Sequence, residues 1–180
     1  MAIERLVHYA GWADKVQQIF SSVNPVASSH FNFSMLEATG VVAILAPEEH
    51  SLIGLVSVMA PVIAGGNTCV ILASESRPLC AITLAEVLHA SDVPGGVVNI
   101  LTGRHAELAP TLAGHLDVDS VWSFSSADLS AEIERGAAGN LKRTWVNHGT
   151  ARDWFGAEGA GRAFLDAATE VKTVWVPYGA

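Results

Sequence analysis

The chain has 180 residues, which is enough for one domain with its own hydrophobic core. Half of the residues are hydrophobic, and ten Lys and Arg stand against 18 Asp and Glu, which gives a net charge of −8. This balance excludes nucleic acids and anionic membrane surfaces as partners, because both require clustered basic side chains.

The first third of the chain predicts a helix, a linker and a strand. Residues 3–20 place apolar side chains near helical spacing, which predicts an opening helix. Residues 21–29, with Pro25, predict a linker. Phe31, Phe33 and Met35 alternate with polar residues, which indicates a half-buried strand. No apolar h-region follows Met1, so we expect a cytoplasmic protein without a signal peptide.

From residue 40 onward, short β-branched runs alternate with helical segments of similar length. The runs are residues 41–45, 68–72, 97–101, 119–123 and 144–146, and the helical patterns are residues 52–64, 78–90, 105–115 and 127–138. Gly and Pro turn signals separate most of them, as in residues 65–67 and 94–96. Nearly continuous apolar strands between helices predict an α/β fold, a doubly wound parallel sheet with helices on both faces. The apolar stretch 52–64 is too short to span a bilayer.

The last part of the chain predicts one helix over residues 157–168 and one long strand over residues 170–178. Pro177 fits only an edge or the end of that strand, because it has no N–H to donate. Cys69 and Cys80 have no metal-ligand or CxxC spacing and are predicted to be buried free thiols. The seven histidines share no spacing either, so we expect no metal site.

Seven segments, in chain order, carry a resemblance to a known family. They are residues 8–15 (HYAGWADK), 39–47 (TGVVAILAP), 61–68 (PVIAGGNT), 93–100 (VPGGVVNI), 117–119 (DVD), 140–143 (NLKR) and 168–174 (ATEVKTV). The first six resemble the coenzyme domain of the aldehyde dehydrogenases, and the last resembles their C-terminal strand. The family's catalytic subdomain lies between the last two segments, where this chain has only a short connection. The layout resembles the truncated second module of the two-domain family 16 aldehyde dehydrogenases.

The resemblance implies a single module of residues 1–180 with three parts. These are a helix and linker over residues 1–29, a Rossmann-like core over residues 39–150, and a β-flap over residues 30–37 and 169–178. The flap strands, near residues 30–36 and 170–178, resemble those that the family uses for oligomerisation.

The resemblance also implies that no residue keeps a catalytic role, so we lean towards a protein that is not an enzyme. The family's nucleophilic cysteine belongs to the missing subdomain. Its general-base glutamate corresponds to Asn147, and an amide cannot accept a proton from water near neutral pH. Its oxyanion-stabilising asparagine corresponds to the acidic pair Glu48 and Glu49, which would repel a developing oxyanion.

Coenzyme binding is predicted to be vestigial. The lysine that holds the adenosine ribose in the family corresponds to Leu72, and the partner glutamate corresponds to Glu75. The Gly-Ser turn under the pyrophosphate corresponds to Ser125 and Ser126, and residues 125–128 also read as a helix capping box. The vestigial cofactor-binding positions are therefore Pro47, Glu75, Ser125 and Ser126. No cofactor is expected, and NAD(P) is the alternative.

Several residues have simpler alternative interpretations. Glu48 and Glu49 are expected to stabilise a helix start, with a vestigial acidic pocket or a metal site as the alternative. Arg104 is expected to be a solvated surface charge rather than an anion ligand. A new reaction at Asn147 and His148 is the less favoured hypothesis, since no nucleophile is visible beside them.

The flap indicates a partner. In the family, the strands that Phe31–Met35 and Val171–Pro177 resemble pack against another subunit's catalytic subdomain. We therefore expect a non-catalytic module that is a structural or oligomerisation partner of a full-length NAD-dependent aldehyde dehydrogenase, or a homo-oligomer. The interface candidates are Phe31, Phe33, Val174, Trp175 and Tyr178, with internal packing of the aromatics as the alternative. The alternative functions are a coenzyme-sensing module and an active oxidoreductase with relocated catalytic groups.

Overall fold

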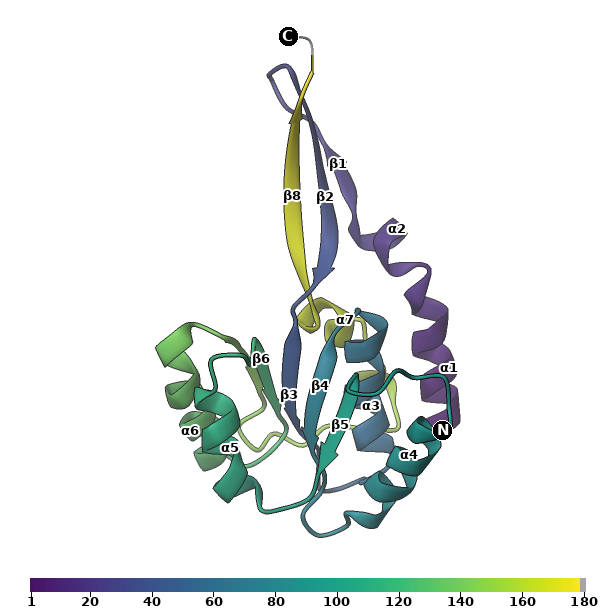
Figure 1. Cartoon of the computed structure of the whole chain (residues 1–180), viewed down its shortest axis with the longest axis vertical. Coiled ribbons are helices and arrows are strands. Elements are labelled where there is room, and N and C mark those ends of the chain that lie inside the picture. The colour runs from purple at the N-terminus through teal and green to yellow at the C-terminus, as the bar shows by residue number, and fades with distance from the viewer. Residues whose placement is uncertain (179–180) are drawn as a thin grey trace.

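The computed structural model describes residues 1–178 and has two sheets, one above the other in Figure 1. A five-stranded parallel sheet has the order β5-β4-β3-β6-β7, and a three-stranded antiparallel sheet has the order β1-β2-β8. The elements are α1 (Ala2–Ala13), α2 (Val16–Phe20), β1 (Ser22–Asn24), β2 (His30–Ala38), β3 (Val41–Leu45), α3 (Ile53–Ala64), β4 (Thr68–Leu72), α4 (Leu79–His89), β5 (Val98–Leu101), α5 (His105–Gly114), β6 (Ser120–Ser123), α6 (Ala127–Ala137), β7 (Arg143–Val146), α7 (Ala163–Ala167) and β8 (Thr169–Pro177), with 3-10 turns at Ala138–Asn140 and Ala157–Gly159.

The parallel sheet confirms the predicted doubly wound α/β core. Its central strand β3 is buried on both faces, since Val42, Ala43, Ile44 and Leu45 are all fully buried. Val42 and Ile44 pack in the cluster formed with α1, α3, α4 and α7, whereas Ala43 and Leu45 pack against α5 and α6. The alternation of a strand explains why one apolar run serves both layers. The chain reverses its direction of winding between β3 and β6.

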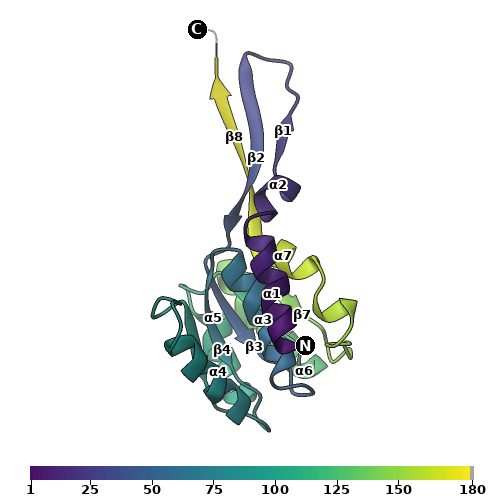
Figure 2. The ribbon, with the colours of Figure 1, turned by 90° about the vertical axis from the view of Figure 1, so that its right-hand side faces the viewer.

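The flap is the three-stranded sheet, which stands above the parallel sheet (Figure 1). In Figure 2 its strands β8, β2 and β1 lie side by side above α1 and α2. β2 and β8 pair antiparallel from His30 opposite Pro177 to Ala38 opposite Thr169, so both predicted flap strands are present. The structure adds β1 in the segment predicted as a linker. Side chains hold β1 in place, because the Asn24 amide donates to Asn32 Oδ1 at 2.6 Å and to Ser34 Oγ at 2.8 Å.

Two predicted helices are shorter than expected. The opening helix breaks after Ala13 into α1 and α2. The helix predicted over residues 157–168 reduces to the turn Ala157–Gly159 and the short α7. The turn does not continue into α7, because Ala160 leaves the helical conformation with φ −128° and ψ 9°. Gly159 lies against Trp154, and a side chain there would meet the Trp154 carbonyl oxygen 2.5 Å away.

The connection from β7 to α7 covers β6 and β7 of the parallel sheet with aromatic side chains. Trp154 and Phe164 are buried, and they pack with Phe124 and Trp145 at centroid distances of 4.9–6.3 Å. The guanidinium carbon of Arg152 lies 5.3–5.8 Å from all four ring centroids, and Arg152 Nη1 donates to the Glu158 carbonyl at 2.9 Å. A cation surrounded by aromatic faces is attracted by each ring quadrupole.

We expect Arg152→Met to lower the free energy of unfolding by about 1–2 kcal/mol, because it removes a partly desolvated cation from four rings. Denaturant unfolding measures this value. Arg104→Met is the control, since Arg104 is 77% exposed and only pairs with Glu107, and it should change the free energy by less than about 0.5 kcal/mol. Equal effects of the two substitutions would contradict a stabilising role of the aromatic cluster around Arg152.

Candidate functional site

A cleft of about 770 Å³ lies at the carboxyl ends of β3, β4 and β6. In doubly wound sheets, ligands bind at this edge, where the winding direction reverses. Of the predicted site residues, the cleft brings together Glu49, Glu75, Ser125, Ser126 and Asn147, whereas Pro47 is buried behind it against Gly54. The other lining residues are Glu48, Ser76, His105, Ala106, Phe124, Asp128, Leu129, Glu132, Gly149 and Thr150.

The cleft is acidic. Five carboxylates line it, from Glu48, Glu49, Glu75, Asp128 and Glu132, and no Lys or Arg of the described residues does. Like charges within one concave surface repel further anions, since the field lines concentrate there. The lining therefore disfavours an anionic ligand such as a dinucleotide.

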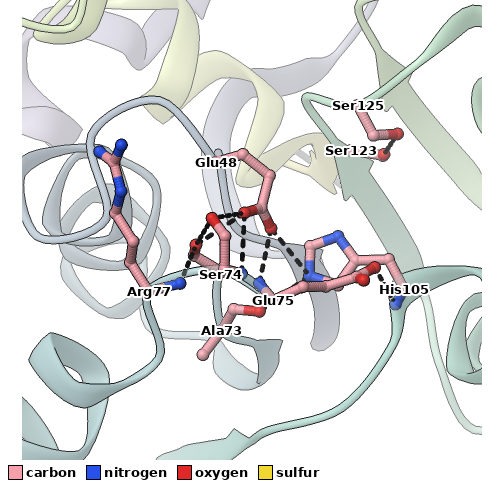
Figure 3. A network of polar contacts seen from close by, with 9 residues as sticks. Glu48, Ala73, Ser74, Glu75, Arg77, His105, Ser123 and Ser125 are labelled. Carbon is pink, nitrogen blue, oxygen red and sulfur yellow. Dashed lines mark hydrogen bonds and ion pairs between the residues drawn. The ribbon is translucent and has the colours of Figure 1, made fainter.

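The carboxylate of Glu48 is the centre of a hydrogen-bond network, shown in Figure 3. It accepts from the hydroxyls of Ser74 at 2.8 Å and Ser76 at 2.7 Å, and from the backbone N–H groups of Glu75 at 2.6 Å and Ser76 at 3.2 Å. Partial burial raises the pKa of this carboxyl, but these four hydrogen bonds outweigh burial and hold the pKa below its ordinary value. Glu48 is therefore a fixed anion tied to the loop after β4.

This arrangement corrects the prediction that Glu48 and Glu49 stabilise the start of the next helix. That helix, α3, begins at Ile53 and has no side-chain cap. Glu48 reaches across to the loop before α4 instead, and the carbonyl of Glu49 accepts from Arg77 Nη1 at 3.2 Å. The prediction failed because the partner lies on the neighbouring strand's loop, far along the chain.

Glu75 and His105 extend the same network to the loop after β5. The Glu75 carboxylate accepts from the backbone N–H of His105, the first residue of α5. The His105 ring is 4% exposed and its Nε2 lies 2.8 Å from the Ala73 carbonyl, which can only accept, so Nε2 donates. His105 was not predicted from the sequence, although a histidine at the start of a helix that follows a strand was a usable signal.

The two serines after β6 have different roles. Ser126 is the N-cap of α6, and its Oγ accepts from the Leu129 N–H at 3.3 Å. Ser125 Oγ instead pairs with Ser123 Oγ at 2.6 Å. The observed N-cap, Ser126, thus lies one residue later than the cap of the predicted Ser125–Asp128 capping box. The helix start still faces the cleft, but one of its N–H groups is occupied by Ser126.

Asn147 is committed to its own turn. Its Nδ2 donates to the Thr150 carbonyl at 2.7 Å, and its Oδ1 accepts from the Gly149 N–H at 3.3 Å. His148 and Gly149 have φ values of 51° and 77°, so this turn uses the left-handed conformation twice. His148 Nε2 lies 3.5 Å from a Glu134 carboxylate oxygen, and His148 does not line the cleft. The amide of Asn147 therefore holds the turn.

The residues present do not fit a nicotinamide dinucleotide. Leu72 is fully buried in the core, so no cation stands where the resemblance implies a lysine. Glu75 is engaged by His105, and the cleft lining is acidic throughout. Among residues 1–178 no group of three or more His, Cys, Asp or Glu side chains is arranged to hold a metal ion.

The cysteines differ from the prediction that both are buried. Cys69 lies fully buried in β4, and burial raises the pKa of its thiol to about 12, although a backbone hydrogen bond from Asn99 opposes this. Cys80 is exposed on α4. Neither thiol lines the cleft. Arg104 is exposed and pairs with Glu107, as expected for a surface charge.

The flap has one apolar and one polar face. Residues opposite each other share a face, so Phe31, Phe33 and Val23 lie with Val176 and Val174. The other face has a ladder of side-chain hydrogen bonds among Asn24, Asn32, Ser34 and Thr173. Trp175 belongs to this second face, where its ring lies 5.8 Å from that of His30. Tyr178 follows β8, and its N–H donates to the Ser29 carbonyl. Trp175 therefore does not share a face with the other strand residues among the interface candidates.

Comparison with known proteins identifies relatives of this chain. The model of the aldehyde dehydrogenase family matches residues 1–172. Hydroxyisobutyraldehyde dehydrogenase of Mycolicibacterium austroafricanum is 36% identical over 130 residues, which are 72% of this chain and 25% of that protein. An aldehyde dehydrogenase of Alternaria alternata is 29% identical over 175 residues, 97% of this chain and 33% of that protein. The crystal structure of PnpE from Pseudomonas sp. WBC-3 superposes with a TM-score of 0.74 at 31% identity and covers 81% of this chain and 30% of that one.

The chain thus spans between a quarter and a third of the length of these relatives. Among the described residues, no helix has the length and apolar character that a membrane span requires.

The Glu48 network predicts an acid-sensitive contribution to stability. The folded pKa lies below the unfolded value of about 4.3, so the stabilisation is present above that value and is lost as the pH falls through the folded pKa. The difference in free energy of unfolding between the wild type and Glu48→Gln should therefore shrink below pH of about 4. The control is Glu132→Gln, because the Glu132 carboxylate lines the cleft but accepts no hydrogen bond from the described residues. The difference in free energy of unfolding between this variant and the wild type should not shrink in the same way. A difference for Glu48→Gln that is constant with pH would contradict the network.

The thiols predict selective labelling. In the native protein, a thiol reagent should modify Cys80 within minutes and leave Cys69 unmodified, because the buried thiol stays protonated. Cys80→Ser should abolish native labelling, and unfolding in denaturant should restore the reaction of Cys69. Rapid native labelling of Cys80→Ser would show that β4 is accessible.

Proposed function

The chain belongs to the aldehyde dehydrogenase family, and we propose that within it the chain is a non-catalytic module that docks through its flap onto an active NAD-dependent aldehyde dehydrogenase. The observation that carries the proposal is the unpaired apolar face of the flap, which stands away from the parallel sheet. The cleft provides the second line of support, since no thiol lines it.

The flap face has the composition of an interface. Phe31 is 48% exposed, Val176 44% and Val23 69%, and all three belong to the face that Phe33 and Val174 share. Aromatic and aliphatic side chains clustered in this way are typical of protein contacts, whereas single exposed apolar residues are not informative. The second edge of β8 pairs with no strand of the described residues. An edge of this length is open to pairing with another chain.

The proposed occupant is the catalytic subdomain of a complete family member. The resemblance gives the flap this contact in the family, and the present chain has only the short segment between β7 and β8 where such a subdomain would be inserted. A second copy of the chain would therefore bring a flap but no matching subdomain. A homo-oligomer is the competing assembly, and the test below distinguishes the two.

The missing chemistry supports a non-catalytic role. Neither thiol faces the cleft, Asn147 is held in its own turn, and Glu48 and Glu49 are acidic where a donor to an oxyanion would be required. The alternative, a coenzyme-binding oxidoreductase or sensor, is favoured only by the position of the cleft at the switch between β3 and β6. The acidic lining opposes it.

The test is purification of the tagged chain from its own cells, with mass spectrometry of the proteins that co-purify. We expect a full-length aldehyde dehydrogenase in a fixed ratio. Phe31→Ser should weaken the complex at least about tenfold, because it removes an exposed aromatic from the apolar face. Trp175→Ala is the matched control on the polar face and should change the affinity by less than about threefold.

Three results would contradict the proposal. Recovery of the chain alone would remove the partner, and recovery of a homo-oligomer alone would assign the flap to self-association. Reduction of NAD by the purified chain with an aldehyde would restore an enzymatic function.

A further inference from the structure

We propose that Glu48 is a built-in occupant of the coenzyme cleft, whose carboxylate fills the donor groups of residues 74–76 and so excludes dinucleotides. The inference concerns the cleft and not the flap, so it is independent of the docking proposal. It starts from the disagreement between the cleft's position, at the edge where such folds bind nucleotides, and its lining, which fits none.

The donor set around Glu48 is the kind that holds an anion. Two hydroxyls, of Ser74 and Ser76, and two consecutive backbone N–H groups, of Glu75 and Ser76, converge on one carboxylate at 2.6–3.2 Å. Successive backbone N–H groups with nearby hydroxyls form concave anion sites in proteins. Here the anion is part of the chain, as Figure 3 shows, so an external phosphate or ribose meets donors that are already in use.

Buried groups hold one side of this donor set. Ser74 is 3% exposed, and its Oγ also accepts from the Arg77 N–H at 3.1 Å. His105 lies behind the loop, with Nε2 at 2.8 Å from the Ala73 carbonyl and 4.0 Å from Glu48 Oε1. The Ser74 hydroxyl is therefore positioned by contacts other than Glu48, whereas Glu75 and Ser76, which supply the other three donors, are exposed.

Glu75 also closes the cleft to a dinucleotide. To accept hydrogen bonds from the hydroxyls of a ribose, Glu75 would need a free carboxylate that faces the cleft. Its carboxylate instead accepts from the His105 N–H at the start of α5, where the helix dipole favours a negative charge. A ribose would have to displace this contact. The loops after β3, β4 and β5 are thus joined by two carboxylates of the chain itself.

The remaining charges act in the same direction. Glu49, Asp128 and Glu132 also line the cleft, and none is balanced by a Lys or Arg of the described lining. A dinucleotide carries two phosphate charges, so its approach is opposed by repulsion as well as by the occupied donors. Removing Glu48 relieves both obstacles, whereas removing Glu132 relieves only one charge.

This difference defines the experiment. NAD⁺, NADP⁺ and inorganic phosphate are titrated separately into the wild type, Glu48→Ala and Glu132→Gln by calorimetry at low ionic strength. The wild type and Glu132→Gln should show no saturable binding up to about 10 mM of any probe. Glu48→Ala should bind at least one phosphate-bearing probe at least about tenfold more tightly than Glu132→Gln does, because the donors of residues 74–76 are then free.

Two results would overturn the inference. Saturable binding of a dinucleotide by the wild type in the micromolar range would show that the cleft is open despite Glu48. Equal binding by Glu48→Ala and Glu132→Gln would show that the Glu48 carboxylate is not the closing group. Far-UV circular dichroism checks the fold of each variant. If Glu48→Ala does not fold, Glu48→Ser, whose short side chain has no carboxylate to reach these donors, takes its place under the same criteria.

Discussion

The connection from β7 to β8 is the constraint on which the rest of the structure depends. This segment must cover β6 and β7 of the parallel sheet. It must also return the chain to the start of β3, where β8 meets β2. Buried Trp154 and Phe164 meet the first demand. Two side chains of α1 meet the second, since Arg5 Nη2 donates to the Trp154 carbonyl at 3.1 Å and Tyr9 Oη donates to the Gly161 carbonyl at 3.3 Å. Aromatic packing thus lets a short segment complete a domain whose relatives are several times longer.

The flap and the cleft lie at opposite ends of the parallel strands. β3 follows β2 after only Thr39 and Gly40, so the flap rises from the amino ends of the parallel strands (Figure 1). The cleft lies at their carboxyl ends. In the complex proposed above, a partner held by the flap would lie at the opposite end of the parallel strands from the cleft.

The sequence predicted most of the fold because local signals were consistent. The runs 41–45 and 68–72 match β3 and β4 to the residue, since both are apolar, β-branched and bounded by turns. The site was less predictable, because Glu48 finds its donors 26–28 residues away, on a loop that only the sheet brings near. β1 was not predicted for the same reason, since Asn24 holds it through contacts with β2. The two faces of the flap were predictable, because Val174 and Trp175 are adjacent in a strand and must point oppositely.

The Glu48 network shows how a ligand site and a structural link can be the same set of atoms. Donors that bind an external anion must converge on one point, and the hydroxyls and N–H groups of residues 74–76 do so. The carboxylate of the residue directly after the buried β3–Pro47 segment satisfies four donors at once and joins two loops. The stabilisation is gained by the same contact that removes the site from use. In the non-catalytic module proposed above, no requirement for coenzyme affinity would oppose that exchange.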